Sequence, residues 1–295
     1  MNYERVKLQT IRFPEPPANA SVFSDSSINR PGKGAWLYIV IVEEPSTPVK
    51  QILLIILVAF IGFFLFQSSV LVWRFHKGAR FADQSVPFEA VNPESRARIL
   101  VVGDSTGVGT GASRSLDSIA GRLHQDNPHI AVVNRSINGA RVEDLLRQMT
   151  PEDDREFDIV LVQVGGNDIL RFTPLDRLHD MITRVLEEAG RRGRHVIFIS
   201  TGNVGLAPAF FPPLTWIYSS RTRKVRALFI EAAARVDVEY VDLFKERDED
   251  PFLRDPEVYY AADYLHPGSE GYRLWYDELK RQTSINAVLR TTDGK

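Results

Sequence analysis

The chain has 295 residues, of which 44% are hydrophobic and 25% charged, and its formal net charge at pH 7 is −2. This is the composition of a globular protein, and the length suffices for one large domain with an appendage. No dense block of Lys and Arg is present, so nothing indicates a nucleic-acid partner, whose phosphates require clustered positive charge. Cysteine is absent, which excludes disulfides, thiolate catalysis and cysteine-ligated metals.

The first 50 residues show little periodicity. Residues 11–35 are rich in Pro, Ser, Asn and Gly, a composition typical of disorder. We therefore predict a mostly disordered extension over residues 1–50, in which Trp36 to Val42 has the pattern of a short strand without a visible partner. A further hypothesis is that translation begins at Val49 through a non-AUG codon. Peptides from residues 1–48 in the mass spectrum of the native protein would contradict it.

Residues 51–73 carry no charge, and Ile52 to Phe66 form an unbroken apolar run. Twenty-three helical residues span roughly 34 Å, enough for a hydrocarbon core of about 30 Å. We predict a single-pass membrane anchor over residues 51–73, followed by a linker over residues 74–96. A cleaved signal sequence and a buried core helix are the alternatives. The first lacks a small-residue cleavage pattern here, and the second would show a polar stripe.

The orientation of this anchor is indicated by the charges on its two sides. Arg74, Lys77 and Arg80 follow the span, whereas Lys50 is the only close positive residue before it. The positive-inside rule then favours a cytoplasmic C-terminal side. The difference of three charges against one is small, so a periplasmic or extracellular side stays open.

From Arg98 onward, short apolar runs alternate with amphipathic stretches. The runs predict five strands: Ile99–Val102, Ile130–Val133, Ile159–Val164, His195–Ile199 and Glu239–Val241. Helices are expected near Ser113–His124, Val142–Met149, Asp176–Arg191, Trp216–Val236 and Glu270–Gln282. Strands that are apolar on both faces and alternate with helices indicate an α/β domain, here residues 97–285, with a mostly parallel sheet covered on both sides. Residues 286–295 are expected to be a tail.

Polar groups follow these strands in four segments. Ser105 follows the first strand, Asn138-Gly139 the second and Gly165-Gly166-Asn167-Asp168 the third, while Asp263 and His266 precede the last helix. Because functional groups in such sheets collect beyond the carboxyl ends of the strands, we expect the four segments to converge. Each segment alone has a structural explanation, as a loop, a turn or a helix cap.

Together the four segments provide what acyl transfer requires. Ser105 is the candidate nucleophile, His266 the base that takes its proton, and Asp263 the carboxylate that orients the imidazole. The backbone amides of Ser105 and Gly139 and the side-chain amide of Asn167 are candidate donors to an oxyanion.

These four segments, in this order, resemble the four sequence blocks of the SGNH/GDSL hydrolases over about Arg98 to Leu279. The resemblance implies a three-layer α/β/α sandwich with a flavodoxin-like sheet, serine esterase or lipase-like activity, and no metal or organic cofactor. It also implies the roles just given to Ser105, Gly139, Asn167, Asp263 and His266. The family is catalytically broad, so the substrate stays open: short, medium or lipid-like esters, with carbohydrate O-deacetylation or acyl transfer as alternatives.

Two interpretations of another class compete with this one. Gly107-Val108-Gly109-Thr110-Gly111-Ala112 fits a dinucleotide-binding pattern, and Arg135 after the second strand would suit the 2′-phosphate of NADP. That reading leaves Ser105, Asn167 and His266 unexplained, and a tight turn that packs the first helix accounts for the glycines equally well. The other is a catalytically inactive binding protein, but no member of the triad is missing.

The remaining signals concern the pocket and possible partners. An aromatic stretch after the fourth strand includes Phe210, Phe211 and Trp216, which we expect either to line an acyl or aryl pocket or to cap the core. The other histidines show no metal-ligand spacing, so no metal site is expected. The sequence does not indicate an oligomeric state.

Overall fold

The computed structural model describes residues 47–91, 93–149 and 157–292. The predictions made for residues 1–46, including the short strand at Trp36–Val42, lie outside the described residues. The chain divides into two compact units, Met1–Gly62 and Phe63–Lys295. The sheet, the candidate site and all contacts described below belong to the second unit.

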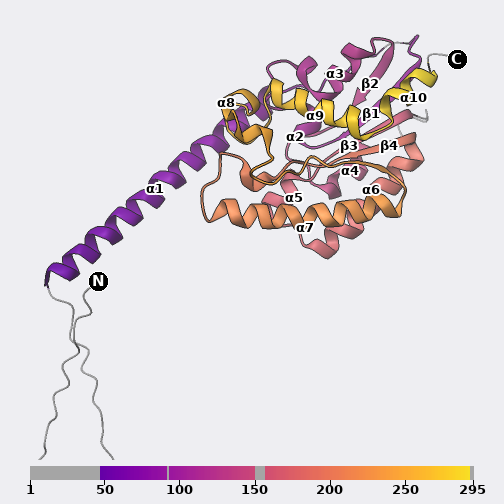
Figure 1. Ribbon diagram of the computed structural model, residues 1–295. Helices are drawn as coiled ribbons and strands as arrows, with labels where there is room; N and C mark the ends of the chain where they lie inside the picture. Colours follow the sequence, from indigo (N-terminus) through magenta and orange to yellow (C-terminus); the bar gives the residue numbers. More distant parts are fainter. Residues whose placement is uncertain (1–46, 92, 150–156, 293–295) are drawn as a thin grey trace, which may run out of the picture. The chain divides into compact units, whose positions relative to one another are not determined.

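The second unit is built on a parallel sheet of five strands (Figure 1). The strands are β1 (Ala97–Gly103), β2 (Ile130–Asn134), β3 (Phe157–Gln163), β4 (Gly193–Ile199) and β5 (Glu239–Val241). Their order is β2-β1-β3-β4-β5, and every neighbouring pair is parallel. The predicted sheet is confirmed, with strand limits that differ by at most two residues from those expected.

Helices cover both faces of this sheet, because alternate residues of each strand point to opposite sides. Ile99 and Val101 of β1 pack in one core cluster with residues of α3 (Ile119–Asp126), α9 (Ser269–Gln282) and α10 (Ile285–Thr292). Leu100 and Val102 pack in the other with residues of α4 (Leu145–Gln148), α6 (Leu175–Arg192) and α7 (Leu214–Arg235). The three-layer α/β/α sandwich is therefore confirmed.

The elements missed from the sequence are mostly short. They are α2 (Ser105–Val108), α5 (Gly166–Leu170), α8 (Pro256–Tyr259) and the 3₁₀ turns Val204–Leu206 and Pro251–Leu253. Two further 3₁₀ turns, Ser115–Asp117 and Val142–Asp144, lie inside segments predicted as helices. A larger difference concerns residues 286–295, which were expected to be a tail. Helix α10 occupies most of it, because Ile285 and Leu289 are buried in the core at 0% and 1% exposure.

Helix α1 (Thr47–Gln84) contains the apolar run and is longer than the predicted anchor. Among the described residues it is the one helix long and apolar enough to cross a membrane. It continues through residues 74–84, which belong to the predicted linker. The reason is visible in the burial pattern of its second half, where partly or fully buried residues recur every three or four positions, as on a helix face packed against a protein. We call this face the inner stripe: Phe64, Gln67, Leu71, Arg74, Gly78 and Ala82.

Candidate active site

The structure brings Ser105, His266 and Asp263 together. Ser105 is the first residue of α2, directly after β1, and the other two lie on the loop between α8 and α9. The Oγ of Ser105 lies 3.1 Å from Nε2 of His266, and Nδ1 of His266 lies 2.6 Å from Oδ2 of Asp263. With the proton on Nδ1, the lone pair of Nε2 faces the serine hydroxyl, which is the arrangement that general-base activation needs.

The two oxygens of Asp263 have separate partners. Oδ1 accepts hydrogen bonds from the backbone amides of Leu265 and His266, both at 3.0 Å, and Oδ2 accepts the one from the imidazole. Complete burial of Asp263 raises the pKa of its carboxyl, but the hydrogen bond and charge of His266 and the two amides outweigh this effect and bring the pKa below its usual value. Asp263 is therefore ionised at neutral pH and can stabilise an imidazolium.

The turn that presents Ser105 is fixed by its neighbours. Asp104 caps α2, with Oδ1 accepting from the backbone amide and the hydroxyl of Thr106, both at 2.8 Å. The side-chain amide of Gln148 bonds both backbone groups of Gly103, at 2.7 and 2.9 Å. Because the residues before and after Ser105 are held in this way, its position does not depend on its own hydroxyl.

Asp104 itself has an unusual electrostatic environment. Burial raises the pKa of its carboxyl from 3.8 to about 6, against the opposing effects of the Thr106 hydrogen bonds and the charge of His266. Since the pKa is higher in the folded than in the unfolded chain, the folded state is penalised once the carboxyl ionises. The associated stability is present below pH 4 and is lost as the pH rises through 6.

Replacing Asp104 by asparagine is accordingly expected to raise the free energy of unfolding at pH 8 by up to about 3 kcal/mol, because the amide keeps an acceptor for Thr106 without the buried charge. Urea unfolding of the full chain in detergent, followed by tryptophan fluorescence at pH 4 and pH 8, measures this. The gain should vanish at pH 4. Asp180→Asn is the control, because that side chain is 86% exposed. Equal changes in the two variants at pH 8 would contradict the expectation.

The candidate oxyanion donors lie in the same cleft as Ser105 and His266. Gly139 has φ +77°, in the left-handed region that favours glycine. Asn167, in α5, donates from Nδ2 to the carbonyl of Ala140 at 3.0 Å and so ties the two segments together. The Gly139 loop is also held through Asn138, whose Oδ1 accepts from the Thr110 hydroxyl at 2.6 Å. Donation by Ser105, Gly139 and Asn167 to a shared oxyanion stays a prediction, which their common place in the cleft supports.

Replacing Asn167 by alanine is expected to lower kcat by roughly 10²–10³-fold, the usual effect of removing one oxyanion donor. KM should change much less, because the interaction is made mainly in the transition state. Steady-state kinetics on a p-nitrophenyl ester measures both constants. Asn127→Ala is a matched control, since Nδ2 of Asn127 also donates to a backbone carbonyl at 3.0 Å but lies outside the cleft. A raised KM with kcat unchanged would instead assign Asn167 to ground-state binding.

The cleft around these residues has a volume of about 780 Å³, which lies in the range of small-molecule sites. Near the nucleophile its lining is polar. Apolar and aromatic side chains form much of the rest, among them Leu170, Val204, Tyr218, Leu243, Phe252 and Trp275. Helix α1 also contributes to the lining, through Phe75, Gly78, Ala79, Ala82 and Asp83.

Of the two roles expected for the aromatic stretch, the structure favours packing over pocket lining, because none of Phe210, Phe211 and Trp216 lines the cleft among the described residues. Phe210 is buried, with its ring 4.7 Å from that of Tyr218, and Phe211 packs edge-on to Phe64. Trp216 is 68% exposed. Side chains two positions apart on a helix point in directions about 200° apart. Because Tyr218 on α7 faces the cleft, Trp216 faces away from it.

The glycine-rich segment is accounted for by packing. Gly109 closes α2 with φ +86°, and a Cβ on Gly107 would lie 2.3 Å from the hydroxyl of Ser136. Arg135, considered above for a 2′-phosphate, donates to the carbonyl of Gln148. These contacts agree with the tight-turn interpretation rather than with dinucleotide binding.

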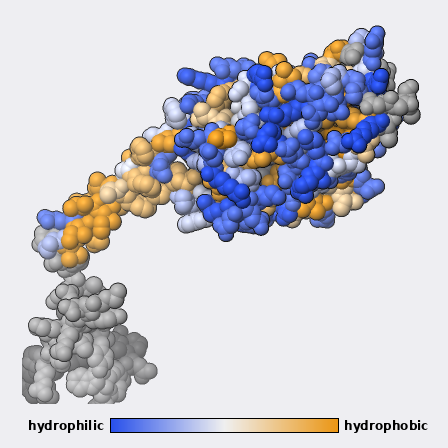
Figure 2. Space-filling view, turned by 45° about the horizontal axis from the view of Figure 1, so that its top comes forward, coloured by the Kyte–Doolittle hydropathy of each residue, from blue (hydrophilic) through white to orange (hydrophobic). Residues whose placement is uncertain are grey.

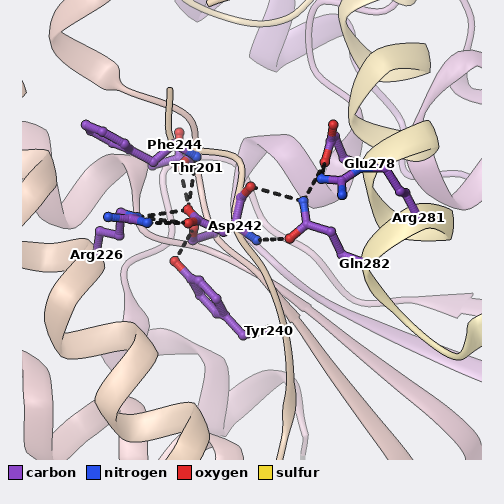
Figure 3. A network of polar contacts seen from close by, with 9 residues as sticks. Thr201, Arg226, Tyr240, Asp242, Phe244, Glu278, Arg281 and Gln282 are labelled. Carbon is purple, nitrogen blue, oxygen red and sulfur yellow. Dashed lines mark hydrogen bonds and ion pairs between the residues drawn. The ribbon is translucent and has the colours of Figure 1, made fainter. Parts of the chain in front are cut away.

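One polar network near the cleft has no counterpart in the sequence analysis (Figure 3). The Asp242 carboxylate, just after β5, pairs with the guanidinium of Arg226 from α7, and Gln282 from α9 bonds both backbone groups of Asp242. The network joins two helices to the strand end that leads into Leu243 and Lys245, which line the cleft. No local motif marks it, since its members come from three distant elements. No group of three or more metal-ligating side chains is found within residues 47–91, 93–149 and 157–292.

The chain matches known proteins both in sequence and in fold. The model of the GDSL-like Lipase/Acylhydrolase family matches residues 101–274. Among solved structures, the chain is similar to a lipolytic G-D-S-L family protein from Veillonella parvula, with 18% identity, coverage of 62% of this chain and 96% of that one, and a TM-score of 0.50. It is also similar to an extracellular lipase from Streptomyces rimosus, with 16% identity, coverage of 63% and 100%, and a TM-score of 0.51. No curated protein gave a significant match.

Proposed function

Because the chain belongs to the GDSL-like Lipase/Acylhydrolase family and is a hydrolase of ester bonds, we propose that it is a membrane-anchored serine hydrolase of carboxylic esters that uses Ser105, His266 and Asp263 as a triad. The observation that carries the proposal is the continuous hydrogen-bonded path from the Ser105 hydroxyl through His266 to Asp263, at the wall of a cleft of suitable size.

In the first half of the reaction, the Ser105 hydroxyl passes its proton to Nε2 of His266 as Oγ attacks the ester carbonyl carbon. The oxyanion of the tetrahedral intermediate is stabilised by the amides of Ser105 and Gly139 and by Asn167. Collapse breaks the bond to the alcohol oxygen, which takes the proton from His266 and leaves. An acyl group is then bound to Ser105.

In the second half, water attacks the acyl-enzyme while Nε2 of His266 takes its proton. Collapse of the second tetrahedral intermediate returns that proton to Oγ of Ser105 and releases the carboxylic acid. Asp263 stays ionised throughout and stabilises the imidazolium that forms twice in each turnover. No cofactor takes part in the proposed sequence.

The substrate proposed is an ester with a medium-length or lipid-like acyl chain. The apolar cleft wall that includes Val204, Leu243 and Phe252 supports this choice, because burial of each methylene contributes about 0.8 kcal/mol. Carbohydrate O-deacetylation and acyl transfer to an alcohol use the same catalytic groups and are the alternatives that the experiment below separates.

Anchoring in a membrane is the second part of the proposal. Figure 2 shows hydrophobic residues gathered along α1, and the most apolar window of this helix has none of its residues buried in the protein. A continuous exposed apolar surface of this kind marks contact with lipid or with another protein. The positive residues Arg74, Lys77 and Arg80 after the run favour a cytoplasmic catalytic unit. Protection of that unit from protease added outside intact cells would support this side, and its digestion would contradict it.

The test is a series of p-nitrophenyl esters from acetyl to dodecanoyl, run beside acetylated sugars and repeated with an added alcohol. Each substrate is assayed on the full chain in detergent micelles, with Ser105→Ala as the blank. We expect kcat/KM to rise with chain length to about eight carbons, and a fluorophosphonate probe to label the wild-type chain. Activity confined to acetylated sugars would favour deacetylation instead, and products dominated by new esters of an added alcohol would favour acyl transfer. A wild-type chain that neither hydrolyses any ester nor reacts with the probe would overturn the proposal.

A further inference from the structure

The second half of α1 contacts the loop that carries Asp263 and His266. The guanidinium of Arg74 lies 4.8 Å from the centre of the Tyr264 ring and also donates to the carbonyl of Pro208. Tyr264 stands between the two triad residues with φ +57°, a strained conformation for a bulky residue. The inner stripe therefore contacts the catalytic loop at Tyr264, its strained residue.

Four residues farther along the inner stripe, Gly78 is buried against the triad itself. A Cβ built on Gly78 would lie 3.0 Å from Oδ2 of Asp263 and 3.7 Å from Cε1 of His266. Oδ2 is the oxygen that accepts the imidazole hydrogen bond. The helix backbone thus covers the back of the Asp263–His266 pair, at a distance that leaves little room for any side chain.

At the next turn, α1 contacts the loop that carries Gly139, a candidate oxyanion donor. The carbonyl of Ala82 accepts a hydrogen bond of 2.8 Å from Nδ2 of Asn138, the residue before Gly139. Between these two contacts, Ala79 lines the cleft, as Gly78 and Ala82 do. One face of the helix therefore touches the candidate base, its carboxylate and the candidate oxyanion loop.

A glycine inside a helix requires an explanation, because it destabilises the helix relative to alanine. At Gly78 the explanation is the close approach to Asp263. Gly62 provides the contrast within the same helix, since a Cβ there would have no atom within 4 Å. The two glycines have the same helical propensity and differ in what surrounds them.

We propose that residues 74–82 of α1 form a wall of the active site and that Gly78 is a positioning residue, which keeps the Asp263–His266 pair in its productive geometry by leaving the space beside Oδ2 free. The inference rests on the proposed function, in which this pair activates Ser105. The uncharged stretch ends at Trp73, five residues or about 7.5 Å of helix before Gly78. This wall therefore places the ester-binding cleft close to the end of the uncharged stretch, where an amphiphilic ester with its acyl chain in lipid would present its carbonyl.

The test compares Gly78→Ala and Gly78→Leu with Gly62→Ala and Gly62→Leu, each in the full chain in detergent micelles. The readouts are kcat and KM on one p-nitrophenyl ester, the rate of fluorophosphonate labelling of Ser105, and Tm. Gly78→Ala should lower kcat at least about 10-fold, since small misplacements of catalytic groups have effects of this order. KM should stay within about twofold, and the labelling rate should fall in proportion to kcat. Gly78→Leu should be close to inactive.

The expected Tm separates positioning from loss of folding. Alanine at residue 78 improves helix propensity as it does at residue 62, so Gly78→Ala should lose activity without any fall in Tm relative to wild type, and both Gly62 variants should keep wild-type kinetics. Equal kcat in Gly78→Ala and Gly62→Ala would overturn the inference and leave the proposed function intact, as would a loss of kcat in Gly78→Ala matched by an equal loss of folded protein. An inactive wild-type chain would overturn both.

Discussion

Replacing Ser105 by alanine is expected to lower the rate of ester hydrolysis by roughly 10⁴–10⁶-fold, the scale seen when the nucleophile of a serine hydrolase is removed. The variant loses the oxygen that forms the acyl bond, and neither His266 nor Asp263 can supply another in the same place. The fold should persist, because the turn around Ser105 is held through Asp104 and Gly103 rather than through the Ser105 hydroxyl. Steady-state kinetics on the preferred p-nitrophenyl ester, together with Tm, measures both expectations.

Ser113→Ala is the control for this variant, because Ser113 is an exposed serine in the segment that follows α2. It should keep wild-type kcat and KM. A Ser105→Ala protein that is folded and retains more than a few per cent of wild-type activity would assign the nucleophile to another residue, and the proposed mechanism would then be wrong.

Replacing His266 by alanine is the second change with a large expected effect, again roughly 10⁴–10⁶-fold in kcat. Without the imidazole at 3.1 Å from Oγ, the serine hydroxyl has no base to take its proton and the leaving alcohol has no acid to give it one. KM should move little, because binding of the acyl chain does not depend on the imidazole. The control is His195→Ala, whose side chain is exposed on β4.

The double variant Ser105→Ala/His266→Ala tests whether the two residues act together in the same step. Residues that act as one unit are strongly non-additive, so the double variant should be no slower than Ser105→Ala alone. If the two losses multiply, the two residues act in separate steps, and the hydrogen bond between them would not be the activating contact. The same comparison with Asp263→Asn should also give non-additive losses.

Much of this site could be predicted from the sequence, because its residues lie in segments whose place in the fold follows from the order of strands and helices along the chain. Ser105 and His266 are 161 residues apart, yet each lies in a segment that a parallel α/β sheet brings to the same edge. The strands were predictable for a similar reason. Runs such as Ile159 to Val164 are apolar on both faces, and only a strand covered by helices on both sides can bury them.

The role of α1 could not be predicted, because its signals are uniform along the sequence. The apolar run has no polar side that would reveal a packed face, and Gly78 resembles any other helical glycine until Asp263 is seen beside it. The predicted linker begins at Arg74, but the guanidinium of this residue contacts the catalytic loop.

The pocket and the Asp242 network depend on side-chain direction and on distant partners. Trp216 and Tyr218 belong to the same aromatic stretch, but only the phase of α7 decides that Tyr218 faces the cleft and Trp216 the solvent. Arg226 and Gln282 meet at Asp242 from two helices. Neither arrangement leaves a periodic pattern that a single sequence reveals.

The central claim is that Ser105 carries the acyl group, and trapping that group tests it most directly. The full chain is mixed with a p-nitrophenyl ester, quenched in acid within milliseconds, digested and analysed by mass spectrometry. The account predicts an acyl adduct on the peptide that contains Ser105, formed in a burst together with p-nitrophenol and absent from Ser105→Ala. An active enzyme whose adduct maps to another residue, or that hydrolyses the ester with no adduct and no burst even when hydrolysis of the acyl-enzyme is slowed by low temperature, would contradict it.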